Sequence, residues 1–109
     1  MGSIVVLRTN GVIELLAAED DVFHQAKEIL GGAHIEVART MIPGLVMLID
    51  EEAKLKKLPP NDMGTALYPY KMDFICGDAV LADLRGAEIC ALKDSGYVKT
   101  LLGFLGAEE

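Results

Sequence analysis

The first part of the chain alternates between β-branched runs and a short polar turn. Residues Ser3 to Arg8 are rich in β-branched side chains and predict a strand, and Val12 to Leu16 predict the strand that returns beside it. The intervening Thr9-Asn10-Gly11 is a turn sequence, because Asn-Gly readily supplies the positive φ values of a tight hairpin. The pattern therefore predicts a β-hairpin at the start of the chain.

The next segment has the apolar spacing of an amphipathic helix. Its apolar residues fall on one helical stripe: Val22, Phe23, Ala26, Ile29 and Leu30. The acidic residues 19–21 suit the positive end of a helix dipole, and Gly31 can provide the left-handed cap that ends a helix. We therefore expect a helix over about residues 20–30.

Two more strands are predicted in the middle of the chain. Residues 34–40 alternate between apolar and polar positions, and Pro43-Gly44 separates them from Leu45 to Ile49. This second run is apolar at every position, which is typical of a central strand with both faces covered. The polar residues 50–57 then predict a connection that holds a short helical turn.

A short helix is predicted after two consecutive prolines. Pro59-Pro60 fixes φ twice and removes two backbone donors, so the chain should be irregular there. Asn61 or Asp62 can cap a helix over Met63 to Leu67, and Pro69 ends it.

The last third of the chain predicts one long strand and a final helix. Residues 73–84 have strand character, with Gly77 as a bulge or a point of close backbone approach. Asp94 or Ser95 can cap a helix to about Leu105. The order ββαββ(α)βα predicts a single α+β domain over residues 1–109, with a mainly antiparallel five-stranded sheet and two main helices packed on it.

Composition narrows the function classes. The net charge is −7 and the basic residues are scattered, which argues against direct binding of a nucleic acid backbone. An apolar share of 51% in a small domain predicts exposed apolar surface, so we expect a homo-oligomer such as a homodimer, or a protein partner. No signal peptide and no apolar run long enough for a membrane span are visible, which favours a cytoplasmic protein without membrane contact.

The residues that usually carry chemistry form no recognisable constellation. Neither serine lies in a nucleophile elbow, and the two histidines are better explained as surface or capping residues. Cys76 and Cys90 form no CxxC pair, so we interpret them as reduced, buried thiols. No zinc, EF-hand or phosphate-loop spacing occurs, and the acidic run 50–52 is best explained as a solvated turn. We therefore expect no catalytic residue, metal or cofactor.

One segment has the composition of a ligand site. Residues 58–70 combine stiff prolines, an amide, a hydroxyl and two tyrosines, and ligand pockets favour such a mixture of apolar surface and fixed polar groups. The alternative is purely structural: Asn61 caps the short helix, while Tyr68 and Tyr70 pack on the rim of the sheet.

The same part of the chain resembles a known family. The matching pieces, in order, are residues 32–37, 45–52, 57–61, 66–68 and 75–81. Together they span about residues 30–82 and resemble a family of small uncharacterised proteins, catalogued as a domain of unknown function and encoded mostly by bacteriophages, plasmids and integrated elements. The first hairpin fits this family loosely, and the tail after Leu84 matches only as a generic helix.

The resemblance implies an accessory protein of a mobile element, and it brings no established activity. Glu36, Asn61 and Asp78 are the polar residues that recur in the matching motifs, so with Tyr68 they are our candidate ligand-binding residues. Each motif residue also has a structural explanation: Glu36 on the wet face of a strand, Asn61 as a helix cap, and Asp78 in a turn beside Gly77.

Three functions are compatible with the sequence. The favoured one is a non-enzymatic binding module that holds a host protein or a small nucleotide-like ligand, for which Arg39, Lys57 or Lys71 would supply positive charge. The second is a homo-oligomeric structural or scaffold protein. The third and least favoured is a small hydrolase that uses Glu36 and Asp78 as paired carboxylates, which would require the two to meet in the fold.

Overall fold

The predicted hairpin opens the chain in the computed structural model, which describes residues 2–106. The elements follow in the order β1 (Ser3–Leu7), β2 (Ile13–Ala17), α1 (Val22–Ile29), β3 (Ile35–Arg39), β4 (Leu45–Asp50), α2 (Asp62–Leu67), β5 (Ala79–Arg85), β6 (Glu88–Cys90) and α3 (Ser95–Phe104). The strands form one sheet in the order β2-β1-β5-β4-β3, with β6 paired to β5. All strand pairs are antiparallel, which confirms the α+β class.

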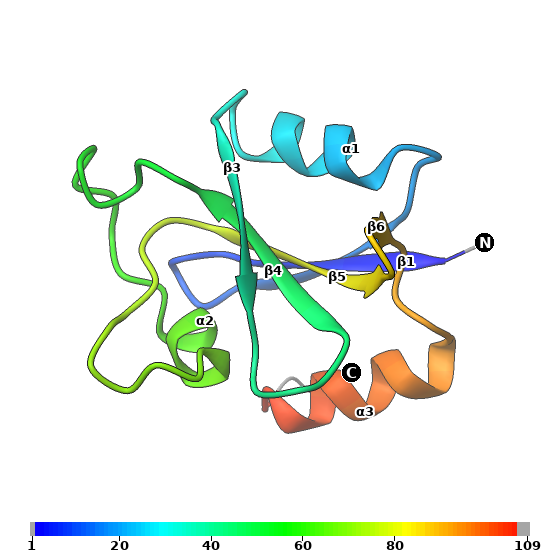
Figure 1. Ribbon diagram of the computed structural model, residues 1–109. Helices are drawn as coiled ribbons and strands as arrows, with labels where there is room; N and C mark the ends of the chain where they lie inside the picture. The colour runs from blue at the N-terminus through cyan, green and yellow to red at the C-terminus, as the bar shows by residue number, and fades with distance from the viewer. Residues whose placement is uncertain (1, 107–109) are drawn as a thin grey trace.

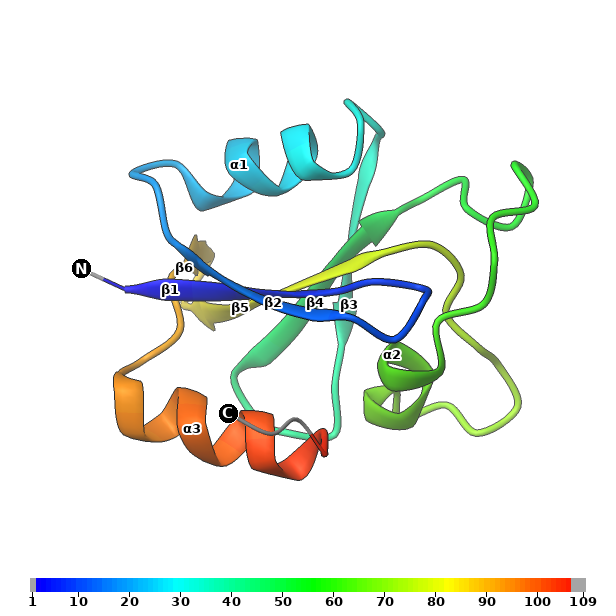
Figure 2. The same cartoon turned by 180° about the vertical axis from the view of Figure 1, so that it is seen from behind.

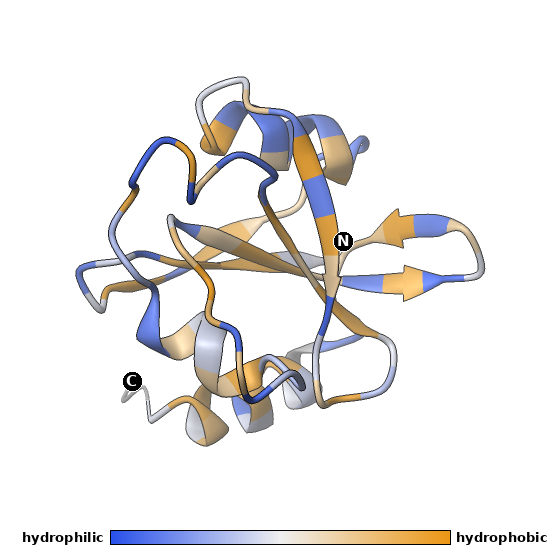
Figure 3. Ribbon diagram, turned by 60° about the vertical axis from the view of Figure 1, so that its left-hand side comes forward, coloured by the Kyte–Doolittle hydropathy of each residue, from blue (hydrophilic) through white to orange (hydrophobic). Residues whose placement is uncertain are grey.

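The sheet is covered on both faces. Helix α1 lies over one face, and α2 and α3 lie against the other (Figures 1 and 2). Side chains alternate between faces along a strand, so on β1 Ile4 and Val6 join the core beneath α1, while Val5 and Leu7 join the core beneath α2 and α3. All six residues of β4 are buried, as expected for a central strand. Figure 3 shows mostly hydrophobic colouring along the central strands and many hydrophilic residues on α1.

The turn between β1 and β2 is longer than an Asn-Gly turn. The Arg8 N–H donates to the Val12 carbonyl oxygen at 2.9 Å, and the Gly11 N–H donates to the Arg8 carbonyl oxygen at 3.0 Å. Gly11 has a φ of +90°, whereas Asn10 is not in the left-handed region. A two-residue type I′ turn needs positive φ at both central residues, so the hairpin uses a wider turn that ends on a single left-handed glycine.

Helices α2 and α3 begin at predicted caps, Asn61 and Asp94, whereas α1 begins at Val22 and is capped by Asp21, one of the acidic residues expected inside its first turn. The side chains of Asp21, Asn61 and Asp94 accept hydrogen bonds from backbone N–H groups in the first turns of α1, α2 and α3. Gly31, directly after the C-cap of α1, has a φ of +75° as predicted.

The long final strand predicted over residues 73–84 is wrong at its start. The strand begins at Ala79, because Gly77 has a φ of +80° and residues 73–78 form a loop. This loop is tied to the Pro59-Pro60 segment by bonds from the Gly77 N–H to the Pro59 carbonyl and from the Asn61 N–H to the Ile75 carbonyl. The short strand β6 was not predicted, since three residues are too few to show a period.

Candidate functional site

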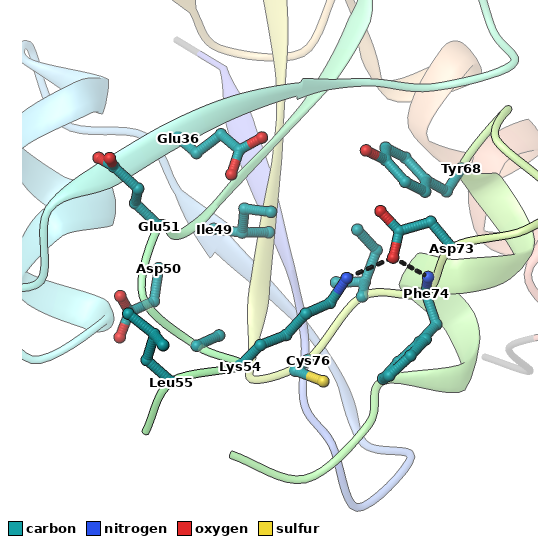
Figure 4. A pocket seen from close by; sticks show the side chains of 12 residues that line it. Glu36, Ile49, Asp50, Glu51, Lys54, Leu55, Tyr68, Asp73, Phe74 and Cys76 are labelled. Carbon is teal, nitrogen blue, oxygen red and sulfur yellow. Dashed lines mark hydrogen bonds and ion pairs between the residues drawn. The ribbon is translucent and has the colours of Figure 1, made fainter. Parts of the chain in front are cut away.

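A small cavity lies between strand β3, the end of β4 and the loops on either side of α2. Its volume is about 130 Å³, and Figure 4 shows the side chains around it. It is lined by Glu36, Ile49, Asp50, Glu51, Ala53, Lys54, Leu55, Tyr68, Asp73, Phe74, Ile75 and Cys76. We refer to it as the acidic pocket, because four of these residues are carboxylates and only Lys54 is basic.

Two of the four candidate residues from the sequence face this pocket from opposite sides. Glu36 on β3 is paired in register with Ile49 on β4, and Tyr68 directly follows α2 (Figure 4). Burial raises the pKa of the Tyr68 hydroxyl, and the negative charges of Asp73 and Glu36 raise it further. Tyr68 therefore presents a neutral hydroxyl to the pocket.

An ion pair crosses the pocket between its two loops. The Lys54 ammonium binds the Asp73 carboxylate, and the Phe74 N–H donates to the same carboxylate oxygen at 2.8 Å (Figure 4). The ammonium also lies 4.7 Å from the centre of the Phe74 ring, within cation–π range. The bond to Lys54 lowers the pKa of Asp73, and the bond to Asp73 raises the pKa of Lys54. The pocket thus already holds one ammonium group by a carboxylate and an aromatic face.

The other carboxylates differ in how they are bonded. Asp50 accepts from the Lys56 ammonium at 2.7 Å and from the Glu52 N–H at 2.8 Å. Burial alone would raise the pKa of Asp50, but these two bonds outweigh it and hold the pKa below its usual range. Within residues 2–106, no hydrogen bond or ion pair engages the carboxylates of Glu36 and Glu51. Glu36 and Glu51 are therefore the carboxylates of the pocket that are available to bind a ligand.

The rim of the pocket carries large exposed apolar side chains. Leu55 and Phe74 line the pocket and are 83% and 50% exposed. Tyr70 is also exposed, and its ring packs edge-on against the lining residue Tyr68 with ring centroids 5.1 Å apart. The two loops thus surround an acidic centre with apolar side chains that the folded chain leaves in solvent.

The third candidate, Asn61, lies outside the pocket and is completely buried. Its amide donates to the carbonyl oxygens of Leu7 and Gly77 at 2.8 and 2.9 Å, and its side-chain oxygen accepts from the Gly64 N–H at 3.0 Å. These bonds join β1, the 73–78 loop and the start of α2. The structural explanation given for Asn61, a helix cap, is therefore confirmed.

The fourth candidate, Asp78, belongs to a different cluster. One of its oxygens accepts from the Arg8 guanidinium at 2.9 Å and the other from the Thr9 N–H at 2.9 Å. Arg8 in turn binds Glu14 at 2.8 Å. Asp78 is therefore held by Arg8 and Thr9, and it does not line the pocket that Glu36 faces.

Several pocket residues were not identified from the sequence. Asp73, Phe74 and Cys76 had been assigned to a strand, where their side chains would have pointed to opposite faces of the sheet. The available signal was Gly77, because a left-handed glycine breaks a strand and turns the preceding residues into a loop.

The cysteines and acidic residues give no evidence of redox or metal chemistry. Neither cysteine is in a disulfide; Cys76 is buried beside the pocket as expected, whereas Cys90 is only half-buried, so the expectation of a buried thiol is wrong there. Among residues 2–106, no three side chains of His, Cys, Asp and Glu are grouped so that they could hold a metal ion. In the same range, no helix has the length and apolar character needed to cross a membrane.

Comparison with known proteins identifies a family but no activity. Neither the curated proteins nor the solved structures contain a match to this chain. A family model matches residues 2–102, so the likeness extends over the first hairpin and most of α3, beyond the central segment recognised in the sequence. The chain belongs to the family described as a domain of unknown function, DUF3846.

Proposed function

We propose that this protein is a non-enzymatic binding module whose acidic pocket takes a basic side chain of a partner protein. The observation that carries the proposal is the pairing of unbonded carboxylates, Glu36 and Glu51, with a rim of exposed apolar side chains. Protein interfaces commonly place a charged or aromatic anchor inside a ring of apolar contacts that excludes water.

The charge of the pocket selects the ligand class. Of the four carboxylates in its lining, Asp73 is paired with Lys54 and Asp50 with Lys56, which leaves Glu36 and Glu51 uncompensated among the described residues. A phosphate group would be repelled by this excess of carboxylates, whereas an ammonium or guanidinium would gain charge-assisted hydrogen bonds. The contact of Lys54 with Asp73 and Phe74 is an internal example of the same recognition.

The size of the pocket supports the same choice. Pockets for whole small molecules usually measure about 300–1,000 Å³, and this one measures about 130 Å³. A volume of this size suits the end of one side chain better than a whole nucleotide. These features favour a protein partner over the nucleotide-like ligand that the sequence had left open.

The setting of the proposal comes from the family resemblance. In an accessory protein of a bacteriophage or plasmid, acting in the cytoplasm, the partner would be a host protein that presents a lysine or arginine between apolar residues. The rim residues Leu55 and Phe74 would then be covered on binding.

The experiment is an NMR titration of ¹⁵N-labelled protein with capped single amino acids. N-acetyl-lysine methylamide and the arginine analogue are the cationic probes, the norleucine analogue lacks the charge, and AMP tests the nucleotide alternative. We expect saturable shifts for backbone amides at 36, 49–55, 68 and 70–76 with the cations only. Binding should weaken at high salt, because exposed charges are screened.

Variants of the free carboxylates provide the specificity test. Glu36→Gln and Glu51→Gln should each weaken the binding of the lysine probe about two- to fivefold, which is the range expected for the loss of one exposed ion pair. Glu19→Gln is the matched control, since Glu19 is exposed and does not line the pocket. Shifts from AMP at these amides, or equal binding by both pocket variants and the control, would contradict the proposal.

A further inference from the structure

Asp83 on strand β5 is a buried carboxylate without a hydrogen-bond partner. It is 1% exposed, and neither of its side-chain oxygens is bonded to any described group. Buried polar atoms are almost always bonded in folded proteins, so an unbonded carboxylate needs a specific explanation. Asp83 lies apart from the acidic pocket, at the opposite end of β5.

The surroundings of Asp83 offer little to stabilise a charge. Its register partners are the apolar Leu45 on β4 and Cys90 on β6. The Arg85 guanidinium lies 3.7 Å from one oxygen, too far for a hydrogen bond, and is itself more than half exposed. The remaining ionisable groups near it are Lys93 and Tyr97, both close enough to interact with its charge.

Helix α3 is the element that covers Asp83. Asp83 shares a sheet face with Ala79 and Leu81, because residues two apart in a strand point to the same side. On that face α3 packs through Val98 and Leu101, and α3 lies along the sheet there in Figures 1 and 2. Strands β4 and β6 close both edges of β5, so water can reach the carboxylate most easily if α3 moves.

We propose that ionisation of Asp83 weakens the docking of α3, so that this helix opens locally from the sheet as the pH rises. The neutral carboxylic acid fits beneath the helix, whereas the carboxylate gains hydration only when the helix lifts. Opening would also uncover apolar residues such as Leu45 and Leu92, which the closed helix keeps dry. The docked α3 would thus act as a pH-sensitive cover.

The direction of the effect follows from proton linkage. Burial raises the pKa of Asp83, and Arg85 and Lys93 offset this only in part. A carboxyl group whose pKa is raised in the closed state stabilises that state. This stabilisation is complete only below the open-state pKa of about 4. It is lost as the pH rises through the closed-state pKa, and the opening constant grows about tenfold for each unit of the shift.

Hydrogen exchange of α3 backbone amides tests the proposal. Protection factors, corrected for the intrinsic effect of pH, are measured between pH 4 and pH 8 for the wild type and Asp83→Asn. We expect α3 protection in the wild type to be lower than that of β1 and to fall as the pH rises. In Asp83→Asn it should stay constant, and the two proteins should converge at pH 4.

Two comparisons make the test decisive. Asp20→Asn removes one exposed carboxylate outside the contacts of α3, and it should behave as the wild type. Protection of α3 that is independent of pH in the wild type, or that falls equally in Asp83→Asn, would overturn the proposal. So would α3 protection equal to that of β1, because the helix would then open only by global unfolding.

Discussion

Buried polar side chains are hydrogen-bonded at one end of the central strands and lack hydrogen bonds at the other. Asp50 and Asn61 are buried at the end of the sheet where β4 ends and β5 begins. Both carboxylate oxygens of Asp50 accept hydrogen bonds, and Asn61 is bonded through its amide nitrogen and its side-chain oxygen. At the other end, where Leu45 pairs with Asp83, the carboxylate is buried without a hydrogen-bond partner among residues 2–106, and its ion-pair contact with Arg85 is 3.7 Å long. The pKa of Asp50 is accordingly lowered and that of Asp83 raised.

The difference lies in what surrounds each carboxylate. Asp50 sits at the end of a strand, where the following turn offers the Glu52 N–H and the Lys56 ammonium. Asp83 sits within β5 between β4 and β6, so the neighbouring backbone N–H groups serve the sheet, and α3 packs on that face of the sheet through the apolar Val98 and Leu101. Burial is similar in both cases, and the available donors decide whether the charge is tolerated.

The largest expected effect is at the bonded end. Asn61→Ala removes three buried hydrogen bonds, and we expect it to lower the free energy of unfolding by about 3 kcal/mol or more. Urea unfolding measures this. Asn61→Asp separates the contributions, because it keeps the acceptor for Gly64 and loses both amide donors. Asn10→Ala, in the exposed turn, is the control and should cost less than about 1 kcal/mol. An equal loss in both alanine variants would refute the importance of the buried network.

The next largest effect should be an increase in the free energy of unfolding rather than a decrease. Asp83→Asn removes an unbonded buried charge, so we expect it to stabilise the protein by about 1–2 kcal/mol at pH 7. The wild type regains this stability as the pH falls, because a group with a raised pKa is protonated early in the folded state. Urea unfolding should therefore show that Asp83→Asn is more stable than the wild type at pH 7, and that this difference disappears at pH 4. A destabilised variant at pH 7 would mean that the charge has a partner in solution.

A smaller loss is expected for the same substitution at the other end. Asp50→Asn should destabilise the protein by about 1 kcal/mol at pH 7, discounted because the Lys56 side chain is nearly half exposed. The stability from a lowered pKa is present above the unfolded value of about 4 and is lost as the pH falls through the folded value. The difference from the wild type should thus shrink toward pH 3 in the same unfolding assay. If Asp50→Asn and Asp83→Asn changed the free energy of unfolding in the same direction, the contrast between the two carboxylates would be wrong.

The smallest effect on stability should come from the pocket. Glu36 is exposed and unbonded, so Glu36→Gln should change the free energy of unfolding by less than about 0.5 kcal/mol. Thermal unfolding of this variant beside the wild type checks it. A neutral effect on stability together with weaker binding of the lysine probe would show that Glu36 is available for a ligand rather than needed for the fold.

The fold followed from local patterns to a large extent. The hairpin, α1, β3, β4 and the capped α2 and α3 are encoded by short-range features such as apolar period, Gly31 and the capping residues Asp21, Asn61 and Asp94. The start of β5 and the strand β6 were missed, because a glycine of positive φ inside an apolar run and a three-residue strand leave weak periodic signals.

The candidate site was only partly visible in the sequence. Glu36 and Tyr68 share the pocket, whereas Asn61 supports the fold and Asp78 binds Arg8. Lys54 and Asp73 are nineteen residues apart and meet only because the Gly77 turn folds the 73–78 loop toward the 51–57 connection. No local pattern marks such a contact.

The sequence by itself determined the class of the fold, the element types and the acidic character of the protein, because these depend on spacing, propensity and charge count. The tertiary structure decided which carboxylates are free, bonded or buried without a partner. That outcome depends on which backbone donors long-range pairing brings near each side chain, as the contrast between Asp50 and Asp83 shows.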